Sequence, residues 1–280
     1  MDNLNQKSPL ETQQTSAMIA LITGASSGLG SEFARQLASR GYDLILAARR
    51  LERLQVLADS LHSEYGIIAQ AQQTDLSNMS GIEQLVSTIR ALPRLDLLVN
   101  SAGFGTVGRF YRVDEVKQLS MMNIHMLAPV LLCRAALPGM VARNQGAIIN
   151  VASLAGLIPI RNVLYFSTKA FLVSFSEALS VELHGSALHV QALCPGFVLT
   201  EFHDTREYTR FSRQSIPSFL WMKPHQVITA SLNALEHNKP ICVPGTFYHF
   251  ASILMRNSLS AFLIKSIAQF ILYHKKRQPT

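Results

Sequence analysis

Cysteine is scarce in this chain of 280 residues, and the few cysteines form no recognisable framework. Cys133, Cys194 and Cys242 are odd in number and far apart, which excludes a disulfide scaffold and a zinc-binding spacing. The nine histidines form no H-x-x-x-H or H-E-x-x-H pattern, so we expect no metal site. A reducing cytoplasm is the simplest setting for such a chain.

The first residues lack an apolar run of signal-peptide length, and dense basic clusters are absent before the last few residues. Residues 1–16 are polar, and we interpret them as a mobile extension. The net charge is +7, but the basic residues are scattered, apart from Lys275-Lys276-Arg277. No basic stretch alternates with aromatic residues, as single-strand binding requires, so nucleic acid is not an expected partner.

What the chain does contain is a regular alternation of apolar runs with helical patterns. Strands are expected at residues 18–22, 43–48, 67–72, 95–100, 147–151, 188–194 and 241–245. Helices are expected at residues 31–40, 51–65, 82–92, 114–137, 165–184 and 223–236. This alternation predicts an α/β fold with a doubly wound parallel sheet of about seven strands and helices on both faces. Ligands of such sheets bind beyond the carboxyl ends of the strands.

A glycine-rich turn, Thr23-Gly24-Ala25-Ser26-Ser27-Gly28-Leu29-Gly30, follows the first expected strand. A strand that turns through glycines into a helix presents backbone N–H groups to a phosphate. The spacing G-x-x-x-G-x-G differs from the general dinucleotide pattern G-x-G-x-x-G. A glycine-rich turn without a ligand is the alternative interpretation.

Two arginines and no carboxylate end the second expected strand, in Ala48-Arg49-Arg50. An acidic residue near this position binds the ribose of NAD, whereas an arginine accommodates the 2′-phosphate of NADP. The sequence therefore favours NADP(H) over NAD(H). In the alternative interpretation, Arg50 only begins the solvated helix that contains Glu52 and Arg53.

Tyr165 and Lys169 are four residues apart, so on a helix they project side by side. A cation close to a phenol favours the phenolate and lowers its pKa from about 10, which suits acid–base work on an alcohol or ketone. Ser153 lies where the apolar run 147–149 gives way to a loop, and its hydroxyl could hold the substrate oxygen. Alternatively, the tyrosine simply packs on a lysine stem.

Further motifs complete an ordered set along the chain. They are Thr23-Gly24-x-x-x-Gly28-x-Gly30, Asp75-Leu76, Asn100-Ser101-Ala102-Gly103, Asn123, Ser153, Tyr165-x-x-x-Lys169 and Pro195-Gly196. From about Met18 to Thr200 the chain thereby resembles the short-chain dehydrogenase/reductase family, in its single-domain branch with a Rossmann-type sheet. Ser101 departs from the family, which most often has a second asparagine there.

The resemblance implies roles for four side chains. Tyr165 would exchange a proton with the substrate oxygen, and Ser153 would orient that oxygen. Lys169 would lower the pKa of the tyrosine and bind the nicotinamide ribose. Asn123 would hold a water that links Lys169 to solvent, which is compatible with an asparagine that breaks the long helix locally.

The resemblance also implies a cofactor site, with Asp75 at the adenine, Ser26 and Arg49 at the 2′-phosphate, and the segment after Pro195 at the nicotinamide. The residues expected to bind NADP(H) are Gly24, Ser26, Ser27, Gly28, Leu29, Gly30, Arg49, Asp75, Leu76, Asn100, Ala102, Gly103, Tyr165, Lys169, Pro195, Gly196, Val198 and Thr200.

Substrate choice should lie mostly after Thr200. Phe104, Leu154 and Phe197 adjoin catalytic motifs and, with Ser153, predict an apolar substrate pocket that suits an aliphatic or ring ketone or an acyl chain. Residues 201–222 are interpreted as a lid over this pocket, or alternatively as an ordinary surface helix.

We divide the chain into an extension (1–16), a catalytic domain (17–245) and a helical C-terminal tail (246–280). Within the tail, residues 260–277 form an amphipathic pattern with a basic end, which either contacts a membrane surface or packs on the fold or a partner subunit. The long helices 114–137 and 165–184 are apolar on more than one face, and the resemblance implies a homodimer or homotetramer.

The predicted function is an NADP(H)-dependent oxidoreductase that interconverts a ketone and a secondary alcohol. Two alternatives stay open: a cofactor-binding sensor or scaffold without turnover, and a lipid reductase that acts at a membrane surface.

Overall fold

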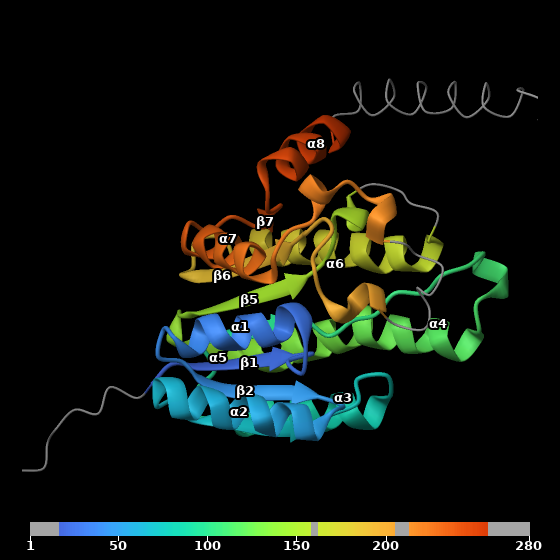
Figure 1. The fold of residues 1–280 in the computed structure, drawn as a ribbon. Helices are drawn as coiled ribbons and strands as arrows, with labels where there is room; N and C mark the ends of the chain where they lie inside the picture. The colour runs from blue at the N-terminus through green and yellow to red at the C-terminus, as the bar shows by residue number, and fades with distance from the viewer. Residues whose placement is uncertain (1–16, 158–161, 205–212, 257–280) are drawn as a thin grey trace, which may run out of the picture.

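The computed structural model describes residues 17–157, 162–204 and 213–256, which contain one parallel seven-stranded sheet (Figure 1). In spatial order its strands are β3 (Ala69–Gln73), β2 (Asp43–Ala48), β1 (Ile19–Thr23), β4 (Leu97–Asn100), β5 (Gly146–Val151), β6 (Leu188–Leu193) and β7 (Ile241–Cys242). The strand order reverses between β1 and β4, which pair in parallel. That reversal opens a crevice at the carboxyl ends of the strands, where such sheets bind ligands.

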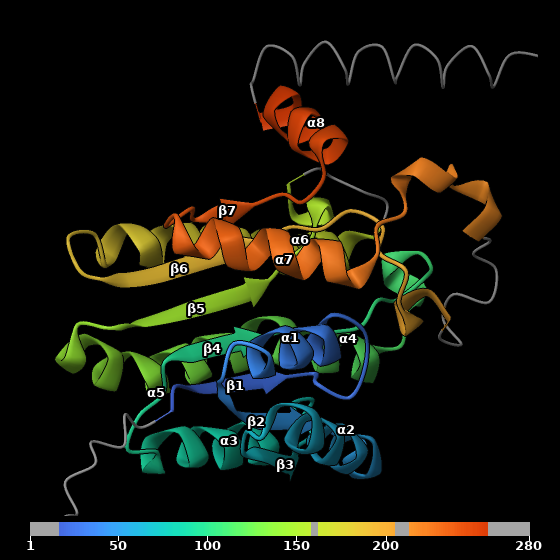
Figure 2. The ribbon, with the colours of Figure 1, turned by 60° about the vertical axis from the view of Figure 1, so that its left-hand side comes forward.

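Helices cover both faces of the sheet, and two apolar cores lie between the layers (Figure 2). One face carries α1 (Gly28–Ala38), α2 (Leu51–Tyr65) and α7 (Pro224–Glu236). The other carries α3 (Met79–Ala91), α5 (Ala128–Arg143) and α6 (Val163–Glu182). The short helix α4 (Glu115–Met122) precedes α5, and α8 (Thr246–Arg256) extends beyond β7 (Figure 1).

The expected fold class is confirmed, and the differences lie at element ends. α1 begins at Gly28 rather than at residue 31. Ser27 is its N-cap residue, so the last glycines of the glycine-rich turn already belong to the helix. The helix expected at 114–137 is interrupted by a π-helical segment, Asn123–Leu127, and continues to Arg143, where Asn144 adopts a left-handed conformation. β7 is only two residues long.

Residues 115–143 together are long and apolar enough to cross a membrane by length and composition. Leu132, Ala136 and Met140 of this stretch are buried in the core beside the sheet, so it is packed as a core helix here. The extension 1–16 and the amphipathic segment 260–277 lie outside the described residues.

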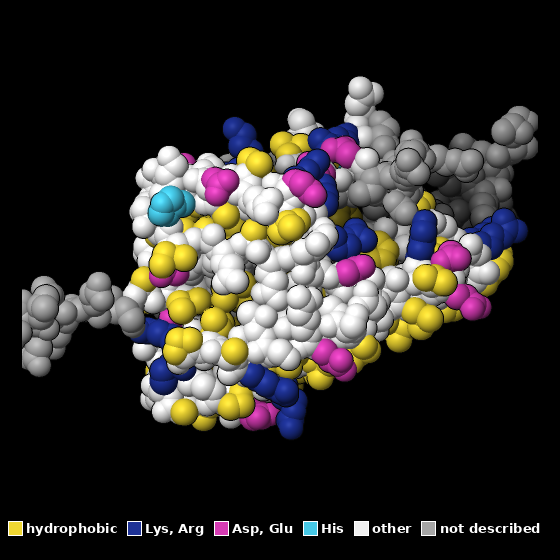
Figure 3. Space-filling model, turned by 90° about the horizontal axis from the view of Figure 1, so that it is seen from below, with side chains coloured by type: hydrophobic (Ala, Val, Ile, Leu, Met, Phe, Trp, Pro, Cys, Tyr) yellow, Lys and Arg dark blue, Asp and Glu magenta, His cyan; other side chains and the backbone are white. Residues whose placement is uncertain are grey.

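Basic side chains do not gather in one place on the face that includes α2 and α3. Figure 3 shows this face, where Lys and Arg side chains lie singly or in small groups among acidic and apolar ones. The scattering of positive charge along the sequence is thus retained on this part of the folded surface.

Candidate active site

A cavity of about 950 Å³ lies at the carboxyl edge of the sheet. The segments that follow β1 to β6 all contribute to its wall. The residues expected to bind cofactor or substrate line it, except Asn100, and the catalytic candidate Asn123 does not line it either. The topology therefore brings motifs that are more than 170 residues apart in sequence into one site.

Two glycines let the turn after β1 pack against its neighbours. Gly24 has φ +69°, and a Cβ on it would lie 2.8 Å from the Cα of Ala102. A Cβ on Gly30 would collide with the carbonyl of Gly24. Thr23 fixes the other side of this turn, because its Oγ1 accepts hydrogen bonds from the N–H groups of Ser101 (3.0 Å) and Ala102 (3.1 Å). The turn leaves room for a dinucleotide phosphate at the N-terminus of α1.

Ser153 and Tyr165 meet at one wall of the cavity. The side chain of Asn162 accepts a hydrogen bond from the N–H of Tyr165, which starts α6 so that Tyr165 lies in its first turn. The Ser153 hydroxyl accepts a hydrogen bond from the N–H of Ala155 (3.1 Å). It also hydrogen-bonds the Tyr165 phenol. Both side chains therefore lie at the same wall of the cavity.

Burial raises the pKa of Tyr165 to about 12, and the hydrogen bond with Ser153 opposes this rise only in part. Desolvation of the phenol therefore dominates its pKa in this structure, and a lowering of the tyrosine pKa by Lys169 remains a prediction. The phenol is accordingly neutral near pH 7, which makes it a proton donor rather than a base.

Lys169 lies one helical turn beyond the tyrosine and is only 5% exposed. Its Nζ donates to the carbonyl of Val151 at 2.7 Å and lies 5.9 Å from the centre of the Tyr165 ring. Burial lowers the pKa of Lys169 from 10.5 to about 8. A lysine with this pKa still carries its charge at pH 7.

His125, which no sequence pattern singled out, lies fully buried in the π-helical segment. Its Nε2 accepts from the N–H of Phe104 (3.2 Å), and its Nδ1 lies 3.0 Å from the Thr168 hydroxyl. Thr168 donates its proton to the Tyr165 carbonyl, so Nδ1 carries the proton of a neutral imidazole. Burial, and next the charge of Lys169, hold the pKa of His125 well below 6.5. This neutral ring ties the loop after β4 to the catalytic helix.

Asn123 and Asn100 have structural contacts in this conformation. Asn123 begins the π-helical segment, as the interpretation of a local helix break predicts, and its Nδ2 donates to the carbonyl of Ser77 (2.7 Å). Asn100 is buried beneath the cavity, where its Nδ2 donates to Asn150 (2.8 Å). The water-holding role of Asn123 and the cofactor contact of Asn100 remain predictions.

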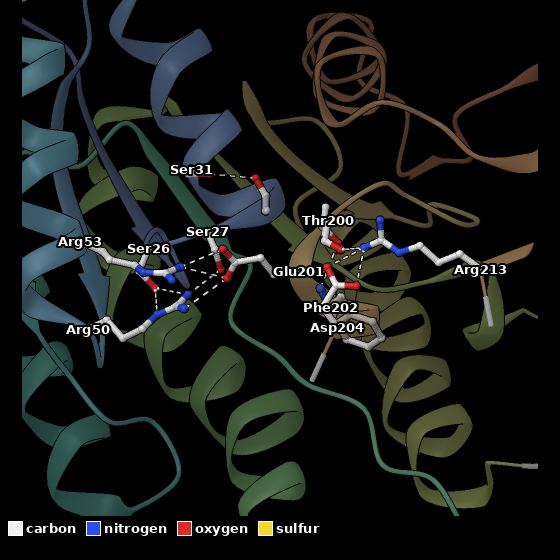
Figure 4. Close-up of polar contacts among 11 residues, drawn as sticks. Ser26, Ser27, Ser31, Arg50, Arg53, Thr200, Glu201, Phe202, Asp204 and Arg213 are labelled. Carbon is white, nitrogen blue, oxygen red and sulfur yellow. Dashed lines mark hydrogen bonds and ion pairs between the residues drawn. The ribbon is translucent and has the colours of Figure 1, made fainter. Parts of the chain in front are cut away.

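Arg50 contributes to the far end of the cavity together with Arg49. Its Nη2 donates to the hydroxyls of Ser27 (2.7 Å) and Ser26 (3.1 Å), and its Nη1 donates to Glu201 (3.2 Å) (Figure 4). Arg50 does begin the exposed helix α2, as the alternative interpretation says, and it also contacts the glycine-rich turn. Neighbouring serines in the glycine-rich turn were the only sequence signal for these contacts. Hydroxyls and guanidinium groups gathered here suit a phosphate.

The opposite end of the cavity is apolar and aromatic. Phe104, Leu154 and Phe197 line it, and the Phe202 ring lies 5.9 Å from that of Tyr165. Contact of these residues with a substrate remains a prediction. Tyr248 from α8 also lines this end, and its hydroxyl donates to the carbonyl of Leu220 (2.7 Å). Nothing in the sequence indicated that the C-terminal extension reaches the site.

The described part of the expected lid is not one surface helix. It forms separate 3-10 turns at Glu201–Asp204, Arg213–Ser215 and Ser218–Leu220. Only the first of these turns, with Thr200 before it, lines the cavity among the described residues of the segment. Closure of this segment as a lid remains a prediction.

No group of three His, Cys, Asp or Glu side chains within the described ranges could hold a metal ion. The three cysteines are buried thiols at positions 133, 194 and 242. Burial raises the pKa of Cys133 to about 12, so this thiol is not ionised near neutral pH.

Known proteins that are similar to this chain are dehydrogenases and reductases. A family model described as short chain dehydrogenase matches residues 18–210. The chain is 38% identical over 193 residues to an NADP-dependent 3-hydroxy acid dehydrogenase, YdfG, of Salmonella typhi, covering 68% of this chain and 76% of that protein. It is 29% identical over 259 residues to a very-long-chain 3-oxoacyl-CoA reductase of Anas platyrhynchos, covering 89% of this chain and 80% of that protein.

Among solved structures, a short-chain dehydrogenase from Sphingobium yanoikuyae in complex with NADPH superposes with a TM-score of 0.76 at 28% identity. The similarity covers 94% of this chain and 98% of that one. The motifs, the sheet and these matches lead to one conclusion: the chain belongs to the short-chain dehydrogenase/reductase family of oxidoreductases.

Proposed function

We propose that this protein is an NADPH-dependent reductase that converts an apolar ketone into a secondary alcohol. One observation carries the proposal: Ser153, Tyr165 and Lys169 converge at one wall of a cavity whose far end gathers arginine and serine side chains. When bound, the dinucleotide would supply the hydride. The residues of the chain would bind it, orient the carbonyl and deliver a proton.

Proton delivery falls to Tyr165, whose phenol is neutral and hydrogen-bonded to Ser153. A carbonyl oxygen that accepts hydrogen bonds from both hydroxyls would be polarised, and its developing negative charge would be shared between them. Lys169 provides a fixed positive charge beside the ring of the tyrosine. That charge favours transfer of the phenolic proton to the substrate, since it stabilises the phenolate left behind.

The cofactor assignment is supported by Arg49 and Arg50, which line the cavity at the end away from Tyr165. It is also supported by the glycine-rich turn 24–30, which lines the same cavity. The relative from Salmonella typhi is named as NADP-dependent, and the superposed structure from Sphingobium yanoikuyae contains NADPH. NAD(H) is the less favoured cofactor, because the end of β2 offers guanidinium groups where a ribose-binding carboxylate would be needed.

An uncharged apolar substrate is supported by the residues around the catalytic wall. Leu154, Phe197 and Tyr248 lie at the end of the cavity that contains Tyr165. The described arginines that line the cavity, Arg49 and Arg50, lie at the other end, which we call the nucleotide end. Of the described Lys and Arg side chains that line the cavity, only Lys169 lies at the end with Tyr165, so a carboxylate substrate would find a single cationic partner there. The two curated relatives are named for 3-hydroxy acids and 3-oxoacyl-CoA, so a carbonyl within an acyl chain belongs to the proposed class.

A panel of ketones tests this function. The purified chain should oxidise NADPH with ring ketones, aliphatic ketones and 3-oxoacyl thioesters, and more slowly with ketose sugars, because the pocket is apolar. Absorbance of NADPH is the measurement, and the same reaction without ketone is the control. Tight binding of NADPH without turnover on any ketone would instead favour a sensor or scaffold.

Arg50→Gln tests the cofactor assignment. We expect it to weaken NADPH binding by roughly 10- to 100-fold and NADH binding by less than about threefold, because it removes charge-assisted hydrogen bonds to a 2′-phosphate. Isothermal titration calorimetry would measure both affinities, with Arg49→Gln as the comparison at the neighbouring position. Arg40→Gln is the control, since Arg40 pairs with Glu236 and does not line the cavity. Equal losses for both cofactors at position 50 would remove the NADP assignment.

We also propose a cytoplasmic homodimer or homotetramer. Val116, Leu119 and Met122 are exposed along α4, and Val181 is exposed on α6. These helices belong to the two long segments at which the family resemblance implies contact between subunits, so exposed apolar side chains there support the assembly.

A further inference from the structure

Glu201 makes an ion-pair contact between two distant parts of the chain at the nucleotide end of the cavity. It follows β6 by eight residues, yet its carboxylate lies on arginines that follow β2 (Figure 4). Arg53 Nη1 donates to both Glu201 oxygens at 2.9 Å, and Arg50 Nη1 donates to Oε2 at 3.2 Å. One carboxylate thus accepts hydrogen bonds from two guanidinium groups.

The same guanidinium group of Arg50 is held by the glycine-rich turn. Its Nε and Nη2 donate to Ser26, and Nη2 also donates to Ser27. Arg50 and Arg53 thus present positive charge to Glu201, while the two serine hydroxyls accept hydrogen bonds from Arg50 (Figure 4). An anion with several acceptor oxygens is what such a set binds, and a carboxylate and a phosphate compete for it.

We propose that Glu201 competes with the 2′-phosphate of NADP(H) for Arg50 and Arg53, and so sets how strongly the protein discriminates NADPH from NADH. This rests on the proposed use of NADP(H). A 2′-phosphate that reaches Arg50 has to displace the Glu201 carboxylate or share the arginine with a like charge. Either event weakens binding of the phosphorylated nucleotide and leaves the unphosphorylated one unaffected.

Exposure of the ion pairs determines the size of the effect. The side chains of Arg50, Arg53 and Glu201 are 43%, 50% and 55% exposed. Solvent screens exposed pairs, so the competition is modest, and removing the carboxylate should strengthen binding by about three- to tenfold. The hydrogen bonds from Arg53, and then from Arg50, hold the pKa of Glu201 below its usual range. The carboxylate is therefore charged at neutral pH.

The chain offers a matched control on the same turn. Asp204 lies three residues after Glu201 and also lines the cavity, but its carboxylate pairs with Arg213 at 2.7 Å. Arg213 in turn donates to the carbonyl of Thr200 (2.8 Å) (Figure 4). Asp204→Asn removes the same charge from the same turn without touching Arg50 or Arg53.

The experiment measures affinities of nucleotide fragments by calorimetry, independently of turnover. Glu201→Gln should bind 2′,5′-ADP about three- to tenfold more tightly than the wild type and bind 5′-AMP within about twofold of it. Asp204→Asn should bind both within about twofold of the wild type. Glu201→Ser, which removes the carboxylate together with most of the side chain, should reproduce the gain for 2′,5′-ADP.

Three results would overturn the proposal, and they are distinguishable. If the wild type prefers 2′,5′-ADP but Glu201→Gln binds it equally or more weakly, Glu201 supports the arginines and does not compete. If Asp204→Asn gains as much as Glu201→Gln, the effect is a general one of charge on the turn. If the wild type binds 2′,5′-ADP and 5′-AMP equally, the NADP assignment fails and the role of Glu201 fails with it.

Discussion

Tyr165→Phe is expected to lower kcat for ketone reduction by roughly 10²- to 10⁴-fold and to leave the Kd for NADPH within about twofold. The substitution removes only the hydroxyl that hydrogen-bonds Ser153. The phenyl ring would keep its contacts with the rings of His125 and Phe202. The centre of each of these rings lies 5.9 Å from the centre of the tyrosine ring. Packing of the cavity wall is therefore retained, and the proton donor is lost.

The same change at Tyr248 provides a control within the same cavity. Tyr248 has a hydroxyl that donates to the carbonyl of Leu220 and accepts from the N–H of Phe197 (3.3 Å), so its hydrogen bonds are made to the backbone and not to Ser153 or Lys169. Tyr248→Phe should therefore reduce kcat by less than about tenfold. Steady-state kinetics with a saturating ketone, and calorimetry for NADPH, would check both variants. A Tyr165→Phe enzyme that keeps a tenth of wild-type kcat would contradict the assigned proton donor.

The sheet, and the convergence of Ser153, Tyr165 and Lys169 at one wall of the cavity, could be predicted from the sequence, because both follow from patterns among residues close together in the chain. Strands such as Leu97–Asn100 are fully buried and read as apolar runs, while Tyr165 and Lys169 lie one turn apart on a single helix. Residues placed at strand ends then meet because parallel strands share a carboxyl edge. Ser153 follows β5 at this edge, and the first turn of α6 brings Tyr165 to it, although twelve positions separate the two residues.

Contacts that depend on tertiary structure could not be predicted in this way. Glu201 and Arg50 are 151 residues apart, and no periodicity links an exposed turn after β6 to the end of β2. Tyr248 reaches the cavity because Gly196 has no side chain where the tyrosine ring packs. The rise in the tyrosine pKa could not be predicted either, since a helical spacing shows a neighbouring cation but not the burial of the phenol.

Lys169→Met is expected to lower kcat by roughly 10²- to 10³-fold while it stabilises the fold at neutral pH. The loss of activity follows from removing the charge beside Tyr165. The gain in stability follows from burial: the lysine pKa is lowered from 10.5 to about 8, so the folded state is penalised for holding the charge. At about 1.4 kcal/mol per pH unit, that penalty is about 3 kcal/mol.

Part of this gain is offset, because the variant leaves the carbonyl of Val151 without the hydrogen bond from Nζ. A lost buried hydrogen bond costs about 1–2 kcal/mol, so the net rise in the free energy of unfolding should be about 1–2 kcal/mol at pH 7. Urea denaturation would measure it. Lys239→Met, at an exposed position, should change the free energy of unfolding by less than about 0.5 kcal/mol.

The pH dependence separates the charge from packing. Between the folded pKa of about 8 and the unfolded value of 10.5, the unfolded lysine binds more protons, so wild-type stability gains with pH relative to the variant. The stability difference at pH 7 should therefore shrink or reverse by about pH 9.5, where the folded lysine is neutral. Over the same range wild-type kcat should fall as Lys169 loses its charge, while the residual kcat of Lys169→Met should not follow that titration. A stability gap that is constant from pH 7 to pH 9.5 would show that side-chain packing, and not a buried charge, distinguishes lysine from methionine at this position.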